Sequence, residues 1–352
     1  MKTVIFTGGH HTSSLVVAKA MQAKGWRVFW FGHRYSMWGD TADSAEYREV
    51  TAAKIEFHNL LAGKFYRTYN PFKLIRIPFG FIHALLLLIR LRPAGIVSFG
   101  GYLAVPTVIC GWLLGIPAIT HEQTVVEGWA NKVVSRFANK VAVTWPVSLK
   151  LFPKNKGVFV GLPLRPEIKA LKKKGVSKKI YDPITVFITG GKQGSHVLNR
   201  IIFDNFNQLG EKYNMIHQTG TSTVYHDYAR AQELHLPNYE AFDFDSHKWI
   251  AALGRADVVV SRAGAHSVYE LSYLGKRSVL IPIPWVSHDE QTKNARQMET
   301  AGLAVVLPEK DLTFKSLMTA IDKAKHFLPE PVNLPDEADE TMVQLIEQEF
   351  NK

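Results

Sequence analysis

Short apolar runs alternate with segments of helical spacing along most of this chain. In the first part of the sequence, the apolar runs predict strands at Thr3 to Phe6, Arg27 to Phe31, Gly95 to Ser98, Ala118 to Thr120 and Lys140 to Val143. Further along, they predict strands at Thr185 to Ile188, Asn214 to Gln218, Val258 to Val260, Ser278 to Ile281 and Ala304 to Leu307. Strands that alternate with helices are typical of a parallel sheet covered on both faces. The predicted fold class is therefore α/β, with Rossmann-like, doubly wound parallel sheets.

A Pro- and Lys-rich segment from Trp145 to Asp182 separates the two series of strands. The chain has 352 residues, which exceeds the roughly 250–300 residues at which a single hydrophobic core stops growing. We therefore expect two domains, at residues 1–160 and 161–332. Residues 333–352 contain a predicted helix from Glu340 to Phe350, which could pack back on the N-terminal domain.

Three glycine-containing turns each join an apolar strand to a helical segment, beginning at Thr7, Thr189 and Ser261. Such a turn directs unpaired N–H groups and the positive end of a helix toward one spot, which suits a phosphate. Glu270 follows the third turn by about one helical turn, where its carboxylate could accept two hydrogen bonds from a ribose diol. Neither of the first two turns has the spacing of a dinucleotide or ATP loop. Together the turns favour a two-domain nucleotide-binding protein.

The formal net charge is +11, and Lys and Arg cluster at residues 64–92 and 150–179. The first cluster surrounds an apolar segment, Phe72 to Arg90, which does not resemble a nucleic-acid groove. Arg76, Pro78 and His83 interrupt this segment, so it cannot comfortably span a bilayer. We expect a helix from Phe79 to Ile89 near an anionic membrane surface. The predicted membrane contacts are Phe72, Ile75, Phe79 and Phe81, whereas Leu85 to Ile89 could equally form a buried core helix.

Cys110 is the only cysteine, so an internal disulfide framework and a multi-cysteine metal site are both excluded. We expect it to be a small core residue in a reducing compartment. The sequence opens directly with a predicted strand and shows no signal-peptide pattern, so no export is expected.

An ordered set of motifs resembles one family of enzymes. The motifs include Thr7-Gly8-Gly9-His10, Phe99-Gly100-Gly101-Tyr102, His121-Glu122-Gln123, Gly161-x-Pro163-x-Arg165, Gly190-Gly191-x-Gln193-Gly194, Ser261-Arg262-Ala263-Gly264-Ala265, Glu270 and Asp289-x-Gln291-Thr292-Lys293-Asn294. They span nearly the whole chain and are similar to those of the MurG family of glycosyltransferases. The resemblance implies the GT-B fold, in which two Rossmann-like domains face a cleft.

By this resemblance, the C-terminal domain binds the donor, UDP-N-acetylglucosamine. Glu270 would hold the ribose hydroxyls, Arg262 and Ala265 would lie on the uridine side, and Phe242 or Phe244 would meet uracil. The diphosphate would lie at the turns that contain Gly191, Gln193, Gly194, Gly264 and Ser267. Gln291 would contact the sugar with support from Thr292 or Asn294, and Arg165 would approach the phosphates. Thr7, Gly8 and Gly9 are also placed on the donor side.

The resemblance makes His10 the base that takes the acceptor proton while the diphosphate leaves, with a binding role as its rival. Glu122 would serve as an orienting carboxylate or as an acceptor contact, and His11 would be incidental. Gly101, Tyr102, Gln123 and Thr124 are the implied acceptor contacts. Helix dipoles and backbone N–H groups would stabilise the leaving UDP, so we expect no cofactor and no metal ion. Asp243-Phe244-Asp245 supplies a rival, metal-binding interpretation.

The implied reaction is inverting transfer of N-acetylglucosamine to the muramyl O4 of undecaprenyl-diphospho-N-acetylmuramoyl-pentapeptide in peptidoglycan synthesis. The enzyme would be a peripheral protein at the cytoplasmic face of the cell membrane, and we expect no nucleic-acid partner. Two alternatives remain: a UDP-N-acetylglucosamine 2-epimerase, and an inactive, membrane-docked sugar-nucleotide-binding protein. Departures from the family pattern at Thr124, Val125 and Leu162 leave the acceptor specificity open.

Overall fold

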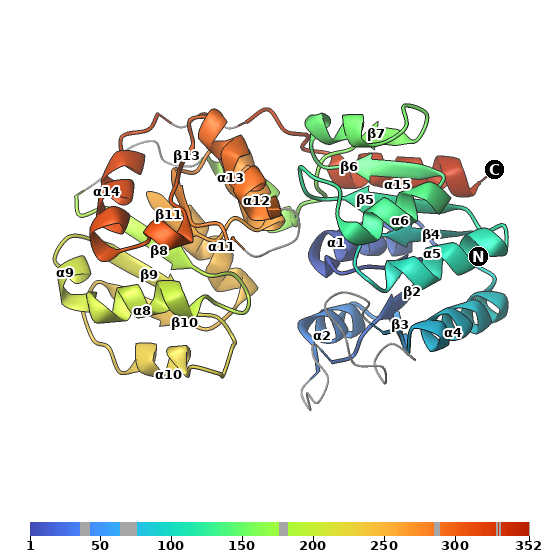
Figure 1. The fold of residues 1–352 in the computed structure, drawn as a ribbon, viewed down its shortest axis with the longest axis horizontal. Helices are drawn as coiled ribbons and strands as arrows, with labels where there is room; N and C mark the ends of the chain where they lie inside the picture. Colours follow the sequence, from blue (N-terminus) through green and yellow to red (C-terminus); the bar gives the residue numbers. More distant parts are fainter. Residues whose placement is uncertain are drawn as a thin grey trace. The chain divides into compact units, whose positions relative to one another are not determined.

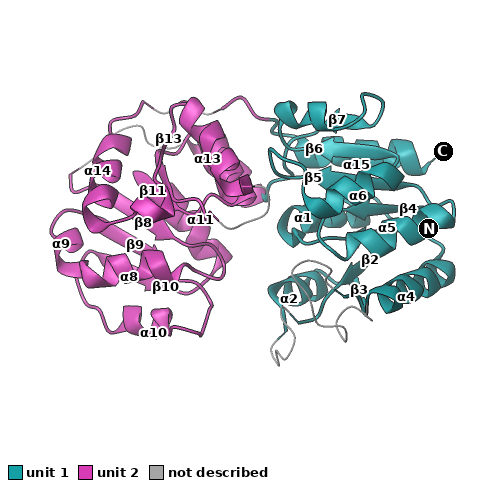
Figure 2. Ribbon diagram, viewed as in Figure 1, with its two compact units in different colours: residues 1–165, 335–352 teal, residues 166–334 magenta. Residues whose placement is uncertain are grey.

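The computed structural model describes residues 1–35, 43–63, 76–175, 182–284, 289–328, 330 and 332–351. The chain forms two compact units (Figure 2). Unit 1 comprises Met1–Arg165 and Pro335–Lys352, and unit 2 comprises Pro166–Leu334. Each unit has its own sheet and hydrophobic core, and each is described separately below.

Unit 1 contains a parallel sheet with strand order β3-β2-β1-β4-β5-β6-β7 (Figure 1). Its strands are β1 (Thr3–Thr7), β2 (Arg27–Gly32), β3 (Glu56–Asn59), β4 (Gly95–Ser98), β5 (Ala118–Glu122), β6 (Lys140–Val143) and β7 (Gly157–Phe159). Its α-helices among the described residues are α1 (His11–Ala23), α2 (Ala45–Ala52), α4 (Arg76–Leu91), α5 (Ala104–Leu113), α6 (Trp129–Phe137) and α15 (Ala338–Phe350). The 3-10 helix η1 (Pro146–Leu151) precedes β7.

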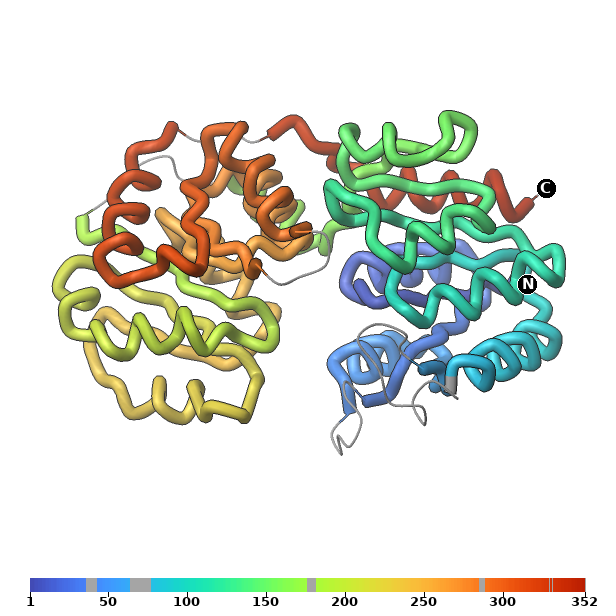
Figure 3. The backbone as a smooth tube through the Cα atoms, in the orientation of Figure 1, coloured from blue at the N-terminus to red at the C-terminus, as the bar shows by residue number. Residues whose placement is uncertain are grey.

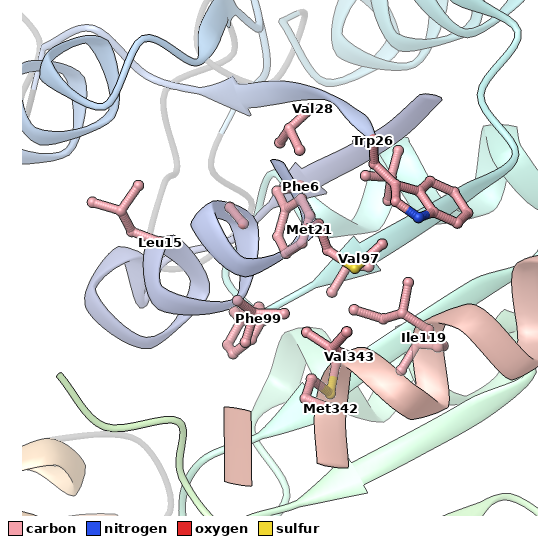
Figure 4. Close-up of a cluster of buried hydrophobic side chains, with 14 of the residues drawn as sticks. Phe6, Leu15, Met21, Trp26, Val28, Val97, Phe99, Ile119, Met342 and Val343 are labelled. Carbon is pink, nitrogen blue, oxygen red and sulfur yellow. The ribbon is translucent and has the colours of Figure 1, made fainter. Parts of the chain in front are cut away.

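Alternate residues of each strand in unit 1 enter opposite cores. Phe6 of β1 joins the core formed with α1, α2 and α15, whereas Ile5 joins the core formed with α4, α5 and α6. Helix α15 comes from the end of the chain and returns to pack beside α1 (Figure 3). Met342 and Val343 of α15 complete the first core next to Phe99 (Figure 4). Unit 1 therefore needs both ends of the chain.

Unit 2 contains a second parallel sheet, with strand order β10-β9-β8-β11-β12-β13. Its strands are β8 (Thr185–Thr189), β9 (Asn214–Gln218), β10 (Tyr239–Phe242), β11 (Val258–Ser261), β12 (Ser278–Leu280) and β13 (Ala304–Val306). Its helices are α7 (Pro166–Lys174), α8 (His196–Asp204), α9 (Phe206–Gly210), α10 (Asp227–Gln232), α11 (Ser246–Arg255), α12 (Ala265–Leu274), α13 (Glu290–Thr300), η3 (Glu309–Asp311) and α14 (Phe314–Ala324). Helices α8, α9 and α14 pack on one face of this sheet.

The predicted class of two doubly wound α/β domains is confirmed. The sequence analysis missed three strands, β3, β7 and β10, and each of them is an edge strand of its sheet. An edge strand pairs on one side only and is less enclosed by helices, so it does not need the continuous apolar run that marks a central parallel strand. The same physical reason therefore explains why the sequence analysis did not predict these three strands.

Candidate active site

Two glycine turns meet at the carboxyl edge of the unit 1 sheet, where the strand order reverses between β1 and β4. Gly8 has φ +143°, and a Cβ atom there would lie 2.7 Å from the backbone N and C atoms of Phe99. The Gly9 N–H donates to the carbonyl of Gly100 at 3.1 Å. Ligands of doubly wound sheets bind at such a reversal. The close approach of the turns brings His10, the residue before α1, to this edge.

The His10 side chain is exposed to solvent. Desolvation by neighbouring protein atoms, and secondly the charge of His11, lowers the pKa of His10 from 6.5 to about 4. Because its pKa is lowered, neutral imidazole predominates at pH 7. His11 instead lies 3.2 Å from the carboxylate of Glu49. His121 is fully buried, and its Nε2 lies 2.8 Å from the carbonyl of Gly161.

Glu122 is buried, and its carboxylate accepts several hydrogen bonds within unit 1. Its carboxylate accepts hydrogen bonds from Thr124 N at 3.1 Å, Thr124 Oγ1 at 3.0 Å, Gly128 N at 2.9 Å and Asn131 Nδ2 at 2.9 Å. Desolvation raises the pKa of Glu122, and these hydrogen bonds oppose that shift. We conclude that Glu122 holds the loop after β5 in shape. Thr124 is also buried, and its hydroxyl bonds within the same loop; its role as an acceptor contact stays a prediction.

Gln123 is the predicted acceptor residue whose environment most clearly indicates a ligand. Its side chain is only 1% exposed, and neither its amide oxygen nor its nitrogen has a hydrogen-bond partner among the described residues. Thr144 Oγ1, at the end of the neighbouring strand β6, is also buried without a partner there. Buried polar groups are nearly always hydrogen-bonded, so these atoms are suited to meet a bound sugar or water. Tyr102 is half-buried, and desolvation raises its pKa to about 12, so it remains a hydroxyl donor.

In unit 2, two helices begin beside each other at the carboxyl edge, because α8 follows β8 and α12 follows the adjacent strand β11. Ser195 and Gly264 are their N-cap residues, and neither helix receives a hydrogen bond from its cap side chain. The turn before α8 is held by Gln218, whose Nε2 donates to the carbonyl of Gly191 at 3.0 Å. Uncapped helix N-termini attract anions. This edge can therefore bind a diphosphate.

Arg262, predicted to lie on the uridine side, is buried and hydrogen-bonded within unit 2. It is 7% exposed, and its Nε and Nη2 donate to Ser195 Oγ at 3.1 and 2.7 Å. Its Nη1 donates to the carbonyl of Ile281 at 3.2 Å, and Nη2 forms an ion pair with Glu309 of η3. Because these contacts occupy the guanidinium inside the protein, Arg262 ties the start of α8 to η3. The uridine-side assignment of Arg262 stays a prediction, and the motif alone could not show which way its side chain turns.

The structure separates the two phenylalanines considered for uracil. Phe242 is buried and its ring stacks on Phe187 with centroids 6.3 Å apart, whereas Phe244 is partly exposed beneath Lys192, whose Nζ lies 5.1 Å from the ring centroid. Phe244 is therefore the one that can reach a base. Asp245, from the Asp-x-Asp sequence, instead caps α11 by accepting hydrogen bonds from the N–H groups of residues 247 and 248, both at 2.8 Å.

Glu270 lies in the second turn of α12 and is 3% exposed. Its Oε2 accepts a hydrogen bond from Trp249 Nε1 at 3.1 Å, a partner that the sequence analysis did not identify. Gln291 and Asn294 are buried on α13, and Gln291 Oε1 accepts the N–H of Ile283 at 3.1 Å, which leaves its NH2 group to face a sugar hydroxyl. Of the remaining predicted donor residues in unit 2, Gln193 is exposed, and four are partly buried: Gly194, Ala265, Ser267 and Thr292. Arg165 is the last residue of the first stretch of unit 1.

Two doubly wound units with glycine turns at their carboxyl edges form the GT-B architecture of glycosyltransferases. Residues 3–143 match the glycosyltransferase family 28 N-terminal domain, and residues 185–349 match the glycosyltransferase family 28 C-terminal domain. The chain belongs to glycosyltransferase family 28, and it is a glycosyltransferase.

Named relatives match the chain almost from end to end. The UDP-N-acetylglucosamine--N-acetylmuramyl-(pentapeptide) pyrophosphoryl-undecaprenol N-acetylglucosamine transferase of Clostridium tetani is 31% identical over 91% of this chain and 89% of its own length. An enzyme of the same name from Bacillus cereus is 31% identical over 92% of this chain and 91% of its own. These matches confirm the resemblance that the motifs indicated.

Solved structures agree on the fold. Acinetobacter baumannii MurG is similar with a TM-score of 0.73 and 24% identity, covering 99% of this chain and 100% of its own. The UDP-GlcNAc 2-epimerase of Neisseria meningitidis, at 10% identity, has a TM-score of 0.62 over 99% of this chain and 100% of its own. The fold alone therefore does not separate a transferase from an epimerase, whereas the sequence relatives do.

Proposed function

We propose that this enzyme transfers N-acetylglucosamine, with inversion, from UDP-N-acetylglucosamine to the muramyl O4 of undecaprenyl-diphospho-N-acetylmuramoyl-pentapeptide. The observation that carries the proposal is the arrangement in unit 2, where two adjacent uncapped helix N-termini lie beside the buried carboxylate of Glu270. A diphosphate and a ribose diol are the groups that such a site recognises. The relatives named for this reaction match through both units, which supports the same acceptor.

The residues divide the chemistry between the two units. In unit 2, the N-termini of α8 and α12 stabilise the negative charge that develops on the leaving UDP, and Glu270 binds the ribose. In unit 1, neutral His10 takes the proton of the acceptor hydroxyl as the new glycosidic bond forms. Buried Gln123 supplies a donor and an acceptor for the incoming sugar, and Glu122 positions the loop that carries it.

An assay with labelled donor and a short-chain, water-soluble analogue of the lipid-linked acceptor tests this function. We expect the labelled disaccharide product, and we expect the same rate in EDTA, since backbone N–H groups and helix dipoles neutralise the leaving group. Epimerised donor would instead identify a 2-epimerase, and binding of UDP-N-acetylglucosamine without turnover would identify an inactive binding protein. Loss of activity in EDTA would instead support metal binding by Asp243 and Asp245.

One face of α4 supports action at a membrane. Phe79, Ile82, Leu86 and Ile89 are 60%, 54%, 60% and 48% exposed, and they recur at helical spacing along one side of the helix. Helix α5 packs beside α4, and its Trp112 and Leu113 are 55% and 65% exposed. We define the four residues of α4 as the apolar face. Such a large exposed apolar surface is typical of an interaction site, and cationic Arg90 and Arg92 at the end of α4 suit anionic headgroups.

The apolar face refines the predicted membrane contacts. Phe79 belongs to it, but Phe81 is half-buried and packs against the core shared with Ala84 and Leu88. Two positions along a helix turn the side chain by about 200°, so Phe79 and Phe81 cannot share a face. Phe72 and Ile75 lie outside the described residues. Within the described part of the chain, none of the helices is long and apolar enough to cross a bilayer. The enzyme acts peripherally, at the cytoplasmic face of the cell membrane.

Replacing Phe79, Ile82 and Leu86 with Ser should weaken binding to anionic phospholipid vesicles by at least about tenfold, because burying each large apolar side chain contributes roughly 1.5–3 kcal/mol. Vesicle co-sedimentation measures the change. The control replaces Val224 and Leu328, which are 71% and 91% exposed in unit 2, and it should bind like the parent. Unchanged binding of the triple variant would remove the apolar face as the membrane contact.

A further inference from the structure

Trp249 of α11 makes a direct contact with the carboxylate that the proposed function assigns to the donor ribose. Its Nε1 donates to Glu270 Oε2 at 3.1 Å. Both side chains are buried, with 6% and 3% of their surface exposed. We propose that Trp249 is a positioning residue that holds Glu270 ready for the ribose hydroxyls and thereby sets the preference for a ribonucleotide. This inference rests on the proposed donor site.

Two features hold the indole of Trp249 in place. The Trp249 ring packs edge-on against Phe187 of β8, with centroids 5.2 Å apart and an interplanar angle of 73°. The helix that carries it begins at Asp245, whose side chain caps the N–H groups of His247 and Lys248. Phe187 is in turn stacked on Phe242. The ring therefore cannot move aside without disturbing the centre of the sheet.

The hydrogen bond between the indole and the carboxylate can run in one direction only, from the Trp249 N–H to Glu270. Indole N–H is a donor and never an acceptor, whereas a carboxylate has about four acceptor positions. The bond to Oε2 therefore restricts the Glu270 rotamer, and ribose hydroxyls would donate to a carboxylate that is already oriented. Immobilising a long, flexible side chain on ligand binding costs conformational entropy. In this site the folded protein already restricts the Glu270 side chain, so ribose binding does not incur that cost again.

The consequence is a specific effect on nucleotide choice. A ribose presents two hydroxyls to Glu270, but 2′-deoxyribose presents one. A correctly oriented carboxylate therefore favours UDP over 2′-deoxyuridine 5′-diphosphate (dUDP), and a reoriented one favours UDP less. A residue that merely stabilised the core would change the affinity for both nucleotides by the same factor. The ratio of the two affinities separates positioning from a general structural role.

Trp249→Phe keeps a ring against Phe187 and removes the N–H donor, so it is the variant to measure. Calorimetric titration should show the dissociation constant for UDP rising about tenfold and that for dUDP rising by less than about twofold. In a Glu270→Ala background, Trp249→Phe should produce no further change in that ratio. Should Trp249→Phe not fold, Trp249→Met fills a similar volume without a donor and is expected to give the same ratio.

Unit 1 offers a matched control. Trp30 Nε1 donates to Glu46 Oε1 at 2.8 Å, and the Trp30 ring is buried against Phe6. Trp30→Phe removes the same kind of bond in the other unit and should leave the UDP to dUDP ratio unchanged. If Glu270→Ala weakens UDP binding but Trp249→Phe leaves the ratio at its parent value, the positioning role is wrong and the donor site stands. If Glu270→Ala does not weaken UDP binding, the donor site itself is wrong.

Discussion

His10→Ala should lower kcat by about 10²- to 10⁴-fold, the usual contribution of a positioned general base, with the dissociation constant for UDP-N-acetylglucosamine unchanged. His10 follows the two-glycine turn after β1 at the reversal of strand order, and the lowered pKa keeps its imidazole neutral at pH 7. A neutral ring can accept the acceptor's proton, and the proposed donor site lies in unit 2. Steady-state kinetics and a separate donor titration would measure the two effects.

The neighbouring histidine provides the control for this prediction. His11 is the first residue of α1, and its Nε2 lies 3.2 Å from Glu49, so His11→Ala should retain nearly the parent rate. Because the pKa of His10 is lowered rather than raised, we expect the acid limb of the kcat profile to lie below pH 6.5 and to disappear in His10→Ala. A His10→Ala enzyme with the parent rate would exclude His10 as the base and leave it a binding residue at most.

Glu270→Ala should weaken UDP binding by about 1.5–3 kcal/mol, roughly 10- to 150-fold in dissociation constant, which is the range for hydrogen bonds to a charged group. The carboxylate is buried near the start of α12, where the proposed function places the donor ribose. Isothermal titration calorimetry with UDP measures the change. Since the substitution also leaves the Trp249 N–H without its acceptor, thermal unfolding of the variant should be recorded alongside.

A second carboxylate in the same unit shows whether the effect is specific. Glu240 of β10 is exposed and pairs with Arg255 at 2.6 Å, so Glu240→Ala changes the net charge of unit 2 by the same amount without touching the proposed site. It should leave UDP affinity at the parent value. Equal losses in Glu240→Ala and Glu270→Ala would mean that overall charge, and not the ribose contact, accounts for the result.

The sequence analysis succeeded where a local pattern has one structural outcome. Central parallel strands are buried on both faces, so their apolar runs identified them. The turns around Gly8 and Gly194 were visible because a side chain at either position would collide with backbone: with Phe99 in the first case and with the carbonyl of Thr219 in the second. Edge strands such as β3 lacked an apolar run. They form because they pair with a neighbouring strand, and their own apolar content is low.

The direction of a side chain was the part that motifs could not supply. Arg262 and Glu122 were both recognised as part of the site, yet each has its hydrogen-bonding groups occupied by the protein itself. Their partners, Ser195, Glu309 and Asn131, come from other elements of the chain. The same is true of Trp249, which no motif marked and which contacts Glu270 only because α11 and α12 pack on one sheet.

The sequence alone identified the central strands, the glycine turns and the ordered motifs that indicate the family, because apolar runs and motifs depend on residues a few positions apart. Tertiary structure decided which of those residues stay available to a ligand. Phe244 is partly exposed whereas Phe242 lies in the core, and Gln123 is unpartnered among the described residues whereas Glu122 is fully hydrogen-bonded. Those outcomes depend on contacts between segments far apart in the chain, which bury or satisfy a polar group irrespective of the motif that contains it.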